Sequence, residues 1–301
     1  MNVIIGATGH IGSQAADILL ERGVPVRVIG RDASRLQQFV ARGAEAAVGD
    51  LRDGAFVARA FAGADALFAM IPPEYGATDF RAYQNDVGAH IASGILKAGI
   101  WYVVNLSSQG ADLREGTGPI LGLRDQEERL NRLEGVNVLH LRPTYFMENL
   151  LMNIPVINRF GYAGSAVRGD QPFGMIATSD IAAFVAERLI NRDFAGKGVR
   201  DLLGERDLTL NEATKILGGR IGLPDLKYVQ FSYADAAKWM QEMGISGDVA
   251  RLFIEMSMAL NNGSFAVGRP RNADNTTPTA IEAFADIFAH AFEQAAHHKA
   301  A

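Results

Sequence analysis

The chain has 301 residues, a formal net charge of −5, 48% hydrophobic residues and no cysteine. This length and composition are those of a globular protein with about two domains and a sizeable core. The lack of cysteine excludes disulfides and thiolate catalysis, and with only six scattered histidines we expect no metal site. The mild negative charge argues against a nucleic-acid surface, and no apolar run approaches the ~18 residues of a membrane span. We expect a cytoplasmic protein, a monomer or a homodimer, whose partner is a small molecule.

Short apolar runs alternate with longer amphipathic segments over the first half of the chain. Strands that are apolar at almost every position are buried on both faces, and their alternation with helices predicts a parallel sheet with right-handed crossovers. The expected fold class is therefore α/β, a doubly wound Rossmann sheet. We predict strands at 3–5, 26–29, 46–48, 66–70, 101–105 and 136–141, and helices at 14–22, 34–41, 56–61, 80–98 and 125–133.

The pattern changes after Pro143. Residues 145–174 are expected to be irregular, and the chain then continues with a helix at 180–189, a strand at 198–203 that returns to the first sheet, and mostly helix. Capping-box spacings begin at Thr209 and Ser232, and residues 280–292 carry one apolar stripe. We expect a Rossmann domain at 1–150 with a return segment at about 175–205. A second, smaller and mainly helical domain would comprise residues 151–174 and 206–301.

A three-glycine loop joins the first predicted strand to the first predicted helix. Gly6 permits a sharp exit from the strand, Gly9 lets a diphosphate approach the backbone, and Gly12 allows the helix to pack closely on the sheet. The helix N-terminus supplies free N–H groups and partial positive charge for the same diphosphate. This context favours a dinucleotide site, and the alternative is a simple glycine turn.

The end of the second strand indicates which dinucleotide is preferred. Binders of the unphosphorylated ribose place an acidic residue there, whereas this chain has Arg31, with Arg35 one helical turn further on. Arginine binds a phosphate in bidentate fashion, which predicts a preference for the 2′-phosphorylated cofactor. The alternative is that Arg31 is a solvated surface charge; Asp32 is interpreted as a helix N-cap. Asp50, after the third strand, either accepts from the adenine amine or closes a turn.

Together, the glycine loop, Arg31, Asp50 and segments 105–108 and 141–149 resemble the NmrA-like group of atypical short-chain dehydrogenases/reductases. The resemblance implies a Rossmann fold, an NADP(H) cofactor and reductase activity. Within the cofactor site, residues 69–72, Ser107 and residues 143–146 would face the nicotinamide half. The residues implied to surround NADP(H) are Gly6, Thr8, Gly9, His10, Ile11, Gly12, Arg31, Arg35, Asp50, Leu51, Ala69, Met70, Ile71, Pro72, Ser107, Pro143, Thr144, Tyr145 and Phe146.

The chain departs from this resemblance in its acid/base residues. Typical short-chain dehydrogenases carry a Tyr-x-x-x-Lys pair, in which the tyrosine protonates the carbonyl oxygen and the lysine lowers its pKa. The corresponding positions here are Pro119 and Leu123, or in the other register Ile120 and Arg124. Ordinary alcohol dehydrogenation is therefore not expected, and no catalytic residue is assigned.

Three functions remain compatible with the missing pair. The first is an NADPH-dependent reductase of a quinone-like, aromatic or conjugated acceptor, which stabilises the incoming charge itself. The second is a non-catalytic redox sensor of the NmrA type, and the third is isomerase or dehydratase chemistry with a retained nicotinamide. Tyr145 is the one aromatic hydroxyl considered as a substitute proton donor, and core packing is the alternative for each aromatic. Candidate substrate-lining residues are Tyr75, Tyr145, Phe146 and Asn149, with Tyr162 and Phe173 as further candidates.

Other polar residues are interpreted structurally. His90 and His140 are expected to be buried structural residues. The charge run at 124–129 is interpreted as a solvated helix face. Asp180 is expected to cap or begin its helix, with Ser179 as the alternative cap.

Overall fold

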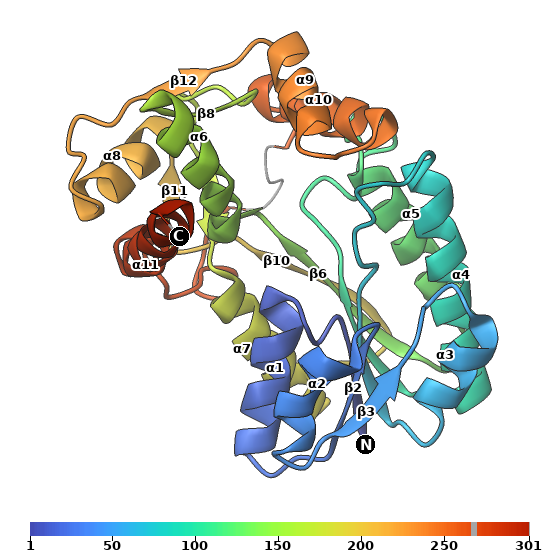
Figure 1. The fold of residues 1–301 in the computed structure, drawn as a ribbon. Coiled ribbons are helices and arrows are strands. Elements are labelled where there is room, and N and C mark those ends of the chain that lie inside the picture. Colours follow the sequence, from blue (N-terminus) through green and yellow to red (C-terminus); the bar gives the residue numbers. More distant parts are fainter. Residues whose placement is uncertain (266–269, 301) are drawn as a thin grey trace.

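The computed structural model describes residues 1–265 and 270–300. Within these ranges, seven parallel strands form one sheet in the order β10-β6-β5-β4-β1-β2-β3 (Figure 1). The strand order reverses between β1 and β4, and doubly wound sheets bind their ligands outside the carboxyl ends of strands at such a point. The strands are β1 (Asn2–Ile5), β2 (Val26–Gly30), β3 (Glu45–Val48), β4 (Ala66–Ala69), β5 (Tyr102–Leu106), β6 (Asn137–Pro143) and β10 (Lys197–Leu202).

Helices cover both faces of this sheet, which confirms the predicted doubly wound fold. Ile4 and Phe68 pack into the apolar core on one face, whereas Val3, Ile5 and Leu67 pack into the core on the other. This alternation explains the continuous apolar runs, because successive residues of one strand enter opposite cores. One face carries α1 (His10–Glu21), α2 (Ala33–Val40) and α7 (Thr178–Asn191), and the other α3 (Gly54–Phe61), α4 (Phe80–Ala98) and α5 (Ile120–Asn131) (Figure 1).

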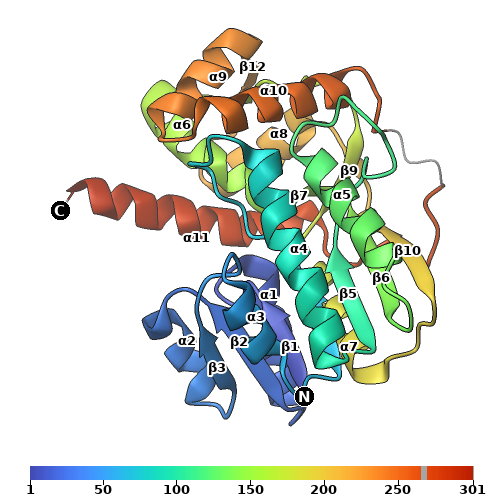
Figure 2. The same ribbon diagram turned by 90° about the vertical axis from the view of Figure 1, so that its right-hand side faces the viewer.

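The remaining elements lie beyond the carboxyl edge of the sheet, where Figures 1 and 2 show α9 and α10 above it. Their core centres on Phe284 and Phe288 of the terminal helix. Two small sheets, in the orders β11-β9-β7 and β12-β8, complete this part. The elements are β7 (Tyr145–Phe146), η1 (Met147–Met152), α6 (Asn153–Phe160), β8 (Ala163–Ser165), β9 (Phe173–Ile176), β11 (Asp207–Leu208), α8 (Leu210–Arg220), β12 (Tyr228–Gln230), α9 (Tyr233–Glu242), α10 (Gly247–Asn261) and α11 (Ile281–Ala300).

Several predicted segments differ in detail from the structure, including α1, which begins at His10, four residues before its predicted start. Residues 145–174 are not irregular throughout, because they contain α6, whose Pro155 stands in the first turn, where no intrahelical N–H bond is lost. Helix α5 begins at Ile120, five residues before its predicted start. Its first turn packs closely on α4, where a Cβ at Gly122 would lie 2.1 Å from Gln84 Oε1. Strand β10 returns beside β6 as predicted, and the Thr209 capping box is present.

Candidate functional site

The glycine loop lies between β1 and the N-terminus of α1. Gly6 has a φ of +72°, which favours glycine. A Cβ on Gly12 would lie 2.3 Å from the Gly6 carbonyl oxygen, so close packing within the protein explains this glycine. Gly9 differs, because its backbone is extended and an added Cβ would meet only the Gly6 oxygen, at 3.4 Å. Packing within the described chain therefore does not require glycine at position 9.

The N-terminus of α1 has a free positive end. Gly9 is its N-cap, no described side chain caps it, and its first turn contains no acidic residue. Unsatisfied N–H groups and the helix dipole favour an anion at such a position. The loop and the helix end together fit the diphosphate of a dinucleotide.

A cavity of about 100 Å³ lies between this loop and the ends of β2 and β3. Asp50 accepts the Arg52 backbone N–H at 2.9 Å and the Arg52 guanidinium at 2.7 Å, and these bonds lower the pKa of its carboxyl group. The structure therefore shows the turn role of Asp50. Arg52 and Tyr83 were missed by the sequence analysis. The cavity brings together Gly6, Thr8, Gly30, Arg31, Gly49, Asp50, Leu51, Arg52, Pro72 and Tyr83.

Arg31 lines this cavity, and Arg35 contacts the neighbouring glycine loop. Arg35 donates to the Thr8 carbonyl oxygen at 2.8 Å, which supports the loop. The Arg31 side chain is 65% exposed, and its Nη1 lies 3.3 Å from Oε2 of Glu74, a residue of the β4–α4 loop. Asp32 accepts from the Ser34 backbone N–H and caps α2, as predicted.

A larger cavity of about 280 Å³, called the inner cavity here, opens at the carboxyl ends of β4, β5 and β6. It unites most residues predicted to face the nicotinamide with all four of the main predicted substrate residues, Tyr75, Tyr145, Phe146 and Asn149. Helix α10 supplies its far wall. The lining residues are Met70, Ile71, Pro73, Tyr75, Phe80, Gln84, Leu106, Ser107, Ser108, Gln109, Pro119, Ile120, Leu123, Pro143, Thr144, Tyr145, Phe146, Asn149, Phe253, Met256, Leu260 and Phe265.

Some predicted site residues lie outside both cavities. Ala69 is buried in the sheet core and Ile11 in the core beneath α1, while His10 is exposed on the first turn of α1. Tyr162 stacks on Phe160 with ring centroids 5.7 Å apart, so it is a packing residue.

The inner cavity is uncharged. Among the residues that the structure describes, those lining it include no Asp, Glu, Lys, Arg or His, and their titratable groups are the phenols of Tyr75 and Tyr145. Burial raises the pKa of Tyr145 well above its ordinary value, so this phenol remains protonated. Pro119, Ile120 and Leu123 belong to the apolar wall of this cavity. They occupy positions that correspond to the tyrosine and lysine of typical short-chain dehydrogenases.

Ser107, at the end of β5, is a buried polar group in the wall of this cavity. Its Oγ has no hydrogen-bond partner in residues 1–265 and 270–300. The hydroxyl lies close enough to Glu127 to help keep that carboxylate ionised, although no well-aligned hydrogen bond joins the two. The neighbouring Ser108 differs, because its Oγ donates to the Gln109 carbonyl oxygen at 3.0 Å. A buried hydroxyl without a partner costs free energy, which favours a ligand at Ser107.

The charge run on α5 was expected to form a solvated helix face, and this expectation was wrong for one of its residues. Glu127 is buried and receives two hydrogen bonds from Arg142 of β6. Burial raises the pKa of Glu127, but the bonds from Arg142, together with the neighbouring polar and positively charged groups, outweigh it, and the pKa lies below its usual value. Arg124 follows the expectation more closely, because it pairs with Glu128 at 2.6 Å.

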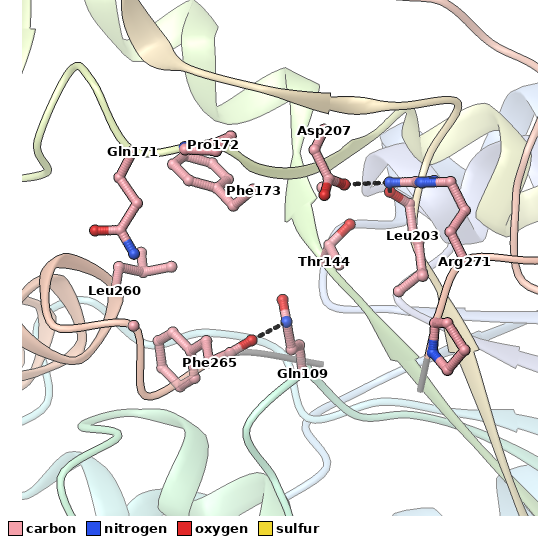
Figure 3. Close-up of a pocket in the computed structure, with 13 residues that line it drawn as sticks. Gln109, Thr144, Gln171, Pro172, Phe173, Leu203, Asp207, Leu260, Phe265 and Arg271 are labelled. Carbon is pink, nitrogen blue, oxygen red and sulfur yellow. Dashed lines mark hydrogen bonds and ion pairs between the residues drawn. The ribbon is translucent and has the colours of Figure 1, made fainter. Parts of the chain in front are cut away.

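A third cavity of about 370 Å³, called the outer cavity here, is drawn in Figure 3. It adjoins the inner cavity, with which it shares wall residues. Both are lined by Gln109, Thr144, Leu260 and Phe265. Figure 3 shows the Gln109 amide directed at the Phe265 carbonyl oxygen, to which it donates. At the far end Asp207 pairs with Arg271, which also donates to backbone carbonyls. Phe173 lines this outer cavity and packs on Tyr145, rather than lining the inner one.

The loop between β4 and α4 is tied to the start of α10. The Ser246 backbone N–H donates to the Tyr75 carbonyl oxygen at 2.8 Å, and the Phe80 N–H donates to Asp248 at 2.9 Å. Tyr83 fixes the other side of this loop by donating to the Pro72 carbonyl oxygen at 2.9 Å. One loop therefore borders both the small cavity at β2 and the inner cavity.

The beginning of α7 corrects another expectation. This helix begins at Thr178, so Asp180 lies in its first turn and neither it nor Ser179 is the cap. Glu148 of η1 accepts from the Thr178 backbone N–H at 3.0 Å and thus takes the capping role. Asp180 instead accepts from the Thr279 backbone N–H and hydroxyl.

No helix in the described part of the chain is long and apolar enough to cross a membrane.

Comparisons with known proteins agree with this geometry. The chain is 27% identical over 258 residues to an NAD(P)H azoreductase from Xenophilus azovorans, a match that covers 85% of this chain and 86% of the relative. Among solved structures, an NADPH-dependent quinone oxidoreductase from Escherichia coli complexed with NADPH superposes with a TM-score of 0.79 at 21% identity, covering 95% of this chain and 99% of the other.

The Citrobacter sp. triphenylmethane reductase complexed with NADP(H) gives a TM-score of 0.78 at 17% identity, covering 96% of this chain and all of the other. At these identities the likeness to both solved structures shows a shared fold. The sequence profile of the NmrA-like family matches residues 2–285, nearly the whole chain. The chain belongs to the NmrA-like family.

Proposed function

We propose that this protein is an NADPH-dependent reductase that transfers hydride to a small, flat, uncharged acceptor such as a quinone. The uncharged inner cavity at the carboxyl edge of the sheet, next to the glycine loop, carries this proposal. Residues 1–150 and about 175–205 would bind the cofactor. Residues 151–174 and 206–301 would form the acceptor side, where α10 contributes Phe253, Met256 and Leu260 to the cavity wall.

The residues present fit NADP(H). Gly9 leaves open backbone for a diphosphate, the end of α1 offers free N–H groups, and Arg31 stands where a 2′-phosphate would lie. When bound, NADPH supplies the hydride. The relatives support the same chemistry, since their names describe reduction of azo compounds, quinones and triphenylmethane dyes.

The inner cavity suits acceptors that need little acid catalysis. Its apolar walls orient a flat ring and exclude water, and orientation alone supplies ~7–11 kcal/mol in favourable cases. A quinone that gains hydride places the new negative charge on its own oxygen, where the Ser107 and Asn149 side chains offer hydrogen bonds. The product hydroquinone needs one further proton, which water supplies, because the raised pKa of Tyr145 makes that phenol a hydrogen-bond donor rather than a proton source.

The test is to mix the protein with NADPH and follow the loss of reduced-nicotinamide absorbance. A neutral naphthoquinone and its sulfonated analogue are compared as acceptors. We expect turnover with both and a higher kcat/KM for the neutral compound, because the cavity offers no positive charge to a sulfonate. Tight NADPH binding without turnover on a broad quinone and dye panel would instead favour the redox-sensor alternative. Absence of NADPH binding would refute both.

A further inference from the structure

The end of β2 lacks the carboxylate that commonly accepts the ribose 2′-hydroxyl, but another segment brings one to this position. Glu74 comes from the β4–α4 loop, 43 residues after Arg31, and its Oε2 lies 3.3 Å from Arg31 Nη1. Its side chain is 38% exposed, so the carboxylate is accessible to a ligand. The arginine expected to bind a 2′-phosphate is therefore already paired with an anion.

The other charges near this cavity are committed elsewhere. Asp50 is bound by Arg52 through side chain and backbone, and Arg35 is bound to the Thr8 carbonyl oxygen. The Tyr83 ring, which lines the cavity, lies within the electrostatic influence of Glu74, Arg31, Asp50 and Arg52. Glu74 is thus held beside the cavity by its pair with Arg31, a lining residue, and the bond from Tyr83 to Pro72 fixes the loop that carries it.

We propose that Glu74 limits the preference of this protein for NADPH over NADH, an inference that rests on the proposed NADPH site. A 2′-phosphate must draw Arg31 away from Glu74 and then lies beside that carboxylate, and both effects weaken NADPH binding. NADH brings no such charge, and its 2′-hydroxyl can donate to Glu74 while Arg31 stays paired. The protein therefore accepts both reduced cofactors, and Glu74 narrows the advantage that Arg31 gives to NADPH.

The experiment is a fluorescence titration of the full chain with NADPH and with NADH, without any acceptor. Glu74→Gln should raise the ratio of NADPH to NADH affinity by about tenfold, equivalent to ~1.4 kcal/mol. Arg31→Ala should lower the same ratio. Glu45→Gln is the matched control, because it removes an equal charge from an exposed pair with Arg27, at the start of β3. We expect its ratio to equal that of the wild type.

An unchanged ratio in Glu74→Gln, and also in Glu74→Ala, would overturn the inference, provided that thermal melts show both variants folded. Its failure differs from failure of the proposed function. If the wild type binds neither nucleotide, the reductase proposal falls, whereas binding with an unaltered ratio removes only the role of Glu74.

Discussion

Arg142 of β6 and Glu127 of α5 form a bidentate ion pair inside the protein. Arg142 Nε lies 2.9 Å from Glu127 Oε1 and Nη2 lies 2.6 Å from Oε2, with side chains 17% and 6% exposed. The pair fixes α5 to the sheet directly behind Ser107. It therefore supports one wall of the inner cavity from outside.

Removing one partner of this pair should destabilise the fold. Glu127→Ala removes both short bonds to the mostly buried Arg142 guanidinium and leaves it only the exposed Asp112 carboxylate, 3.6 Å from Nη1. Removing one partner of a buried pair costs up to ~3–5 kcal/mol. Glu128→Ala is the matched control on the same helix, because its pair with Arg124 is more exposed and contributes below ~1 kcal/mol. Urea unfolding measures both losses. Equal losses in the two variants would contradict a structural role for the Arg142–Glu127 pair.

Two substitutions in the glycine loop should have different effects, one on NADPH affinity and the other on stability. Gly9→Ala should fold normally, because the position has an extended backbone and room for a Cβ, yet it should lose NADPH affinity. Gly12→Ala should lower the melting temperature, because its Cβ would collide with the Gly6 carbonyl oxygen. Thermal melts and nucleotide titrations separate the two effects. Unaltered NADPH affinity in Gly9→Ala would exclude a diphosphate at this loop.

Ser107 and Ser108 form a second matched comparison. Ser107→Ala removes the buried hydroxyl that has no described partner, so we expect kcat with a quinone to fall about tenfold while stability is retained or slightly raised. Ser108→Ala removes only a local bond to the Gln109 carbonyl oxygen and should change kcat little. Steady-state kinetics with NADPH decide the matter, and identical kcat values for both variants would remove Ser107 from the reaction.

His140 predicts how stability depends on pH. Its Nδ1 lies 3.1 Å from Asn105 Nδ2 and its Nε2 lies 3.0 Å from Asn131 Oδ1, a buried arrangement for a neutral ring. Burial lowers its pKa from 6.5 to about 4. The unfolded chain therefore binds a proton first, and the free energy of unfolding should fall as the pH drops from about 6.5 to about 4, by up to ~3 kcal/mol. Urea unfolding across this range should show a shallower slope for His140→Gln, and an identical slope would contradict the assignment.

The outer cavity makes acceptor length a testable variable. It shares four wall residues with the inner cavity, so a two-ring quinone can extend past Gln109 toward Gln171. Gln171→Trp should lower the ratio of kcat/KM for a phenyl-substituted benzoquinone to that for benzoquinone itself. If the tryptophan side chain of Gln171→Trp fills the outer cavity and the ratio of the two kcat/KM values does not change, acceptors occupy the inner cavity alone.

Local sequence signals predicted the features that depend on neighbouring residues. The glycine loop lies between a strand and a helix that are recognisable from a few residues each, and the Thr209 capping box spans four. Pairings across the chain were not predictable. Glu127 has the neighbours of a solvated residue, and only the packing of α5 on β6 places it against Arg142. Glu74 likewise meets Arg31 only because the β4–α4 loop folds back over β2.

Residues 72–80 link two ligand sites mechanically. Pro72 borders the space at β2, Tyr75 borders the inner cavity, and the bonds from residues 75 and 80 to Ser246 and Asp248 hold α10, which lines the inner cavity and would enclose the proposed acceptor. A nucleotide that displaces this loop would therefore also shift α10 at the inner cavity, and a compound in the inner cavity would shift the loop at the nucleotide site. Substitutions along this stretch should alter the Michaelis constants for nucleotide and oxidant in concert.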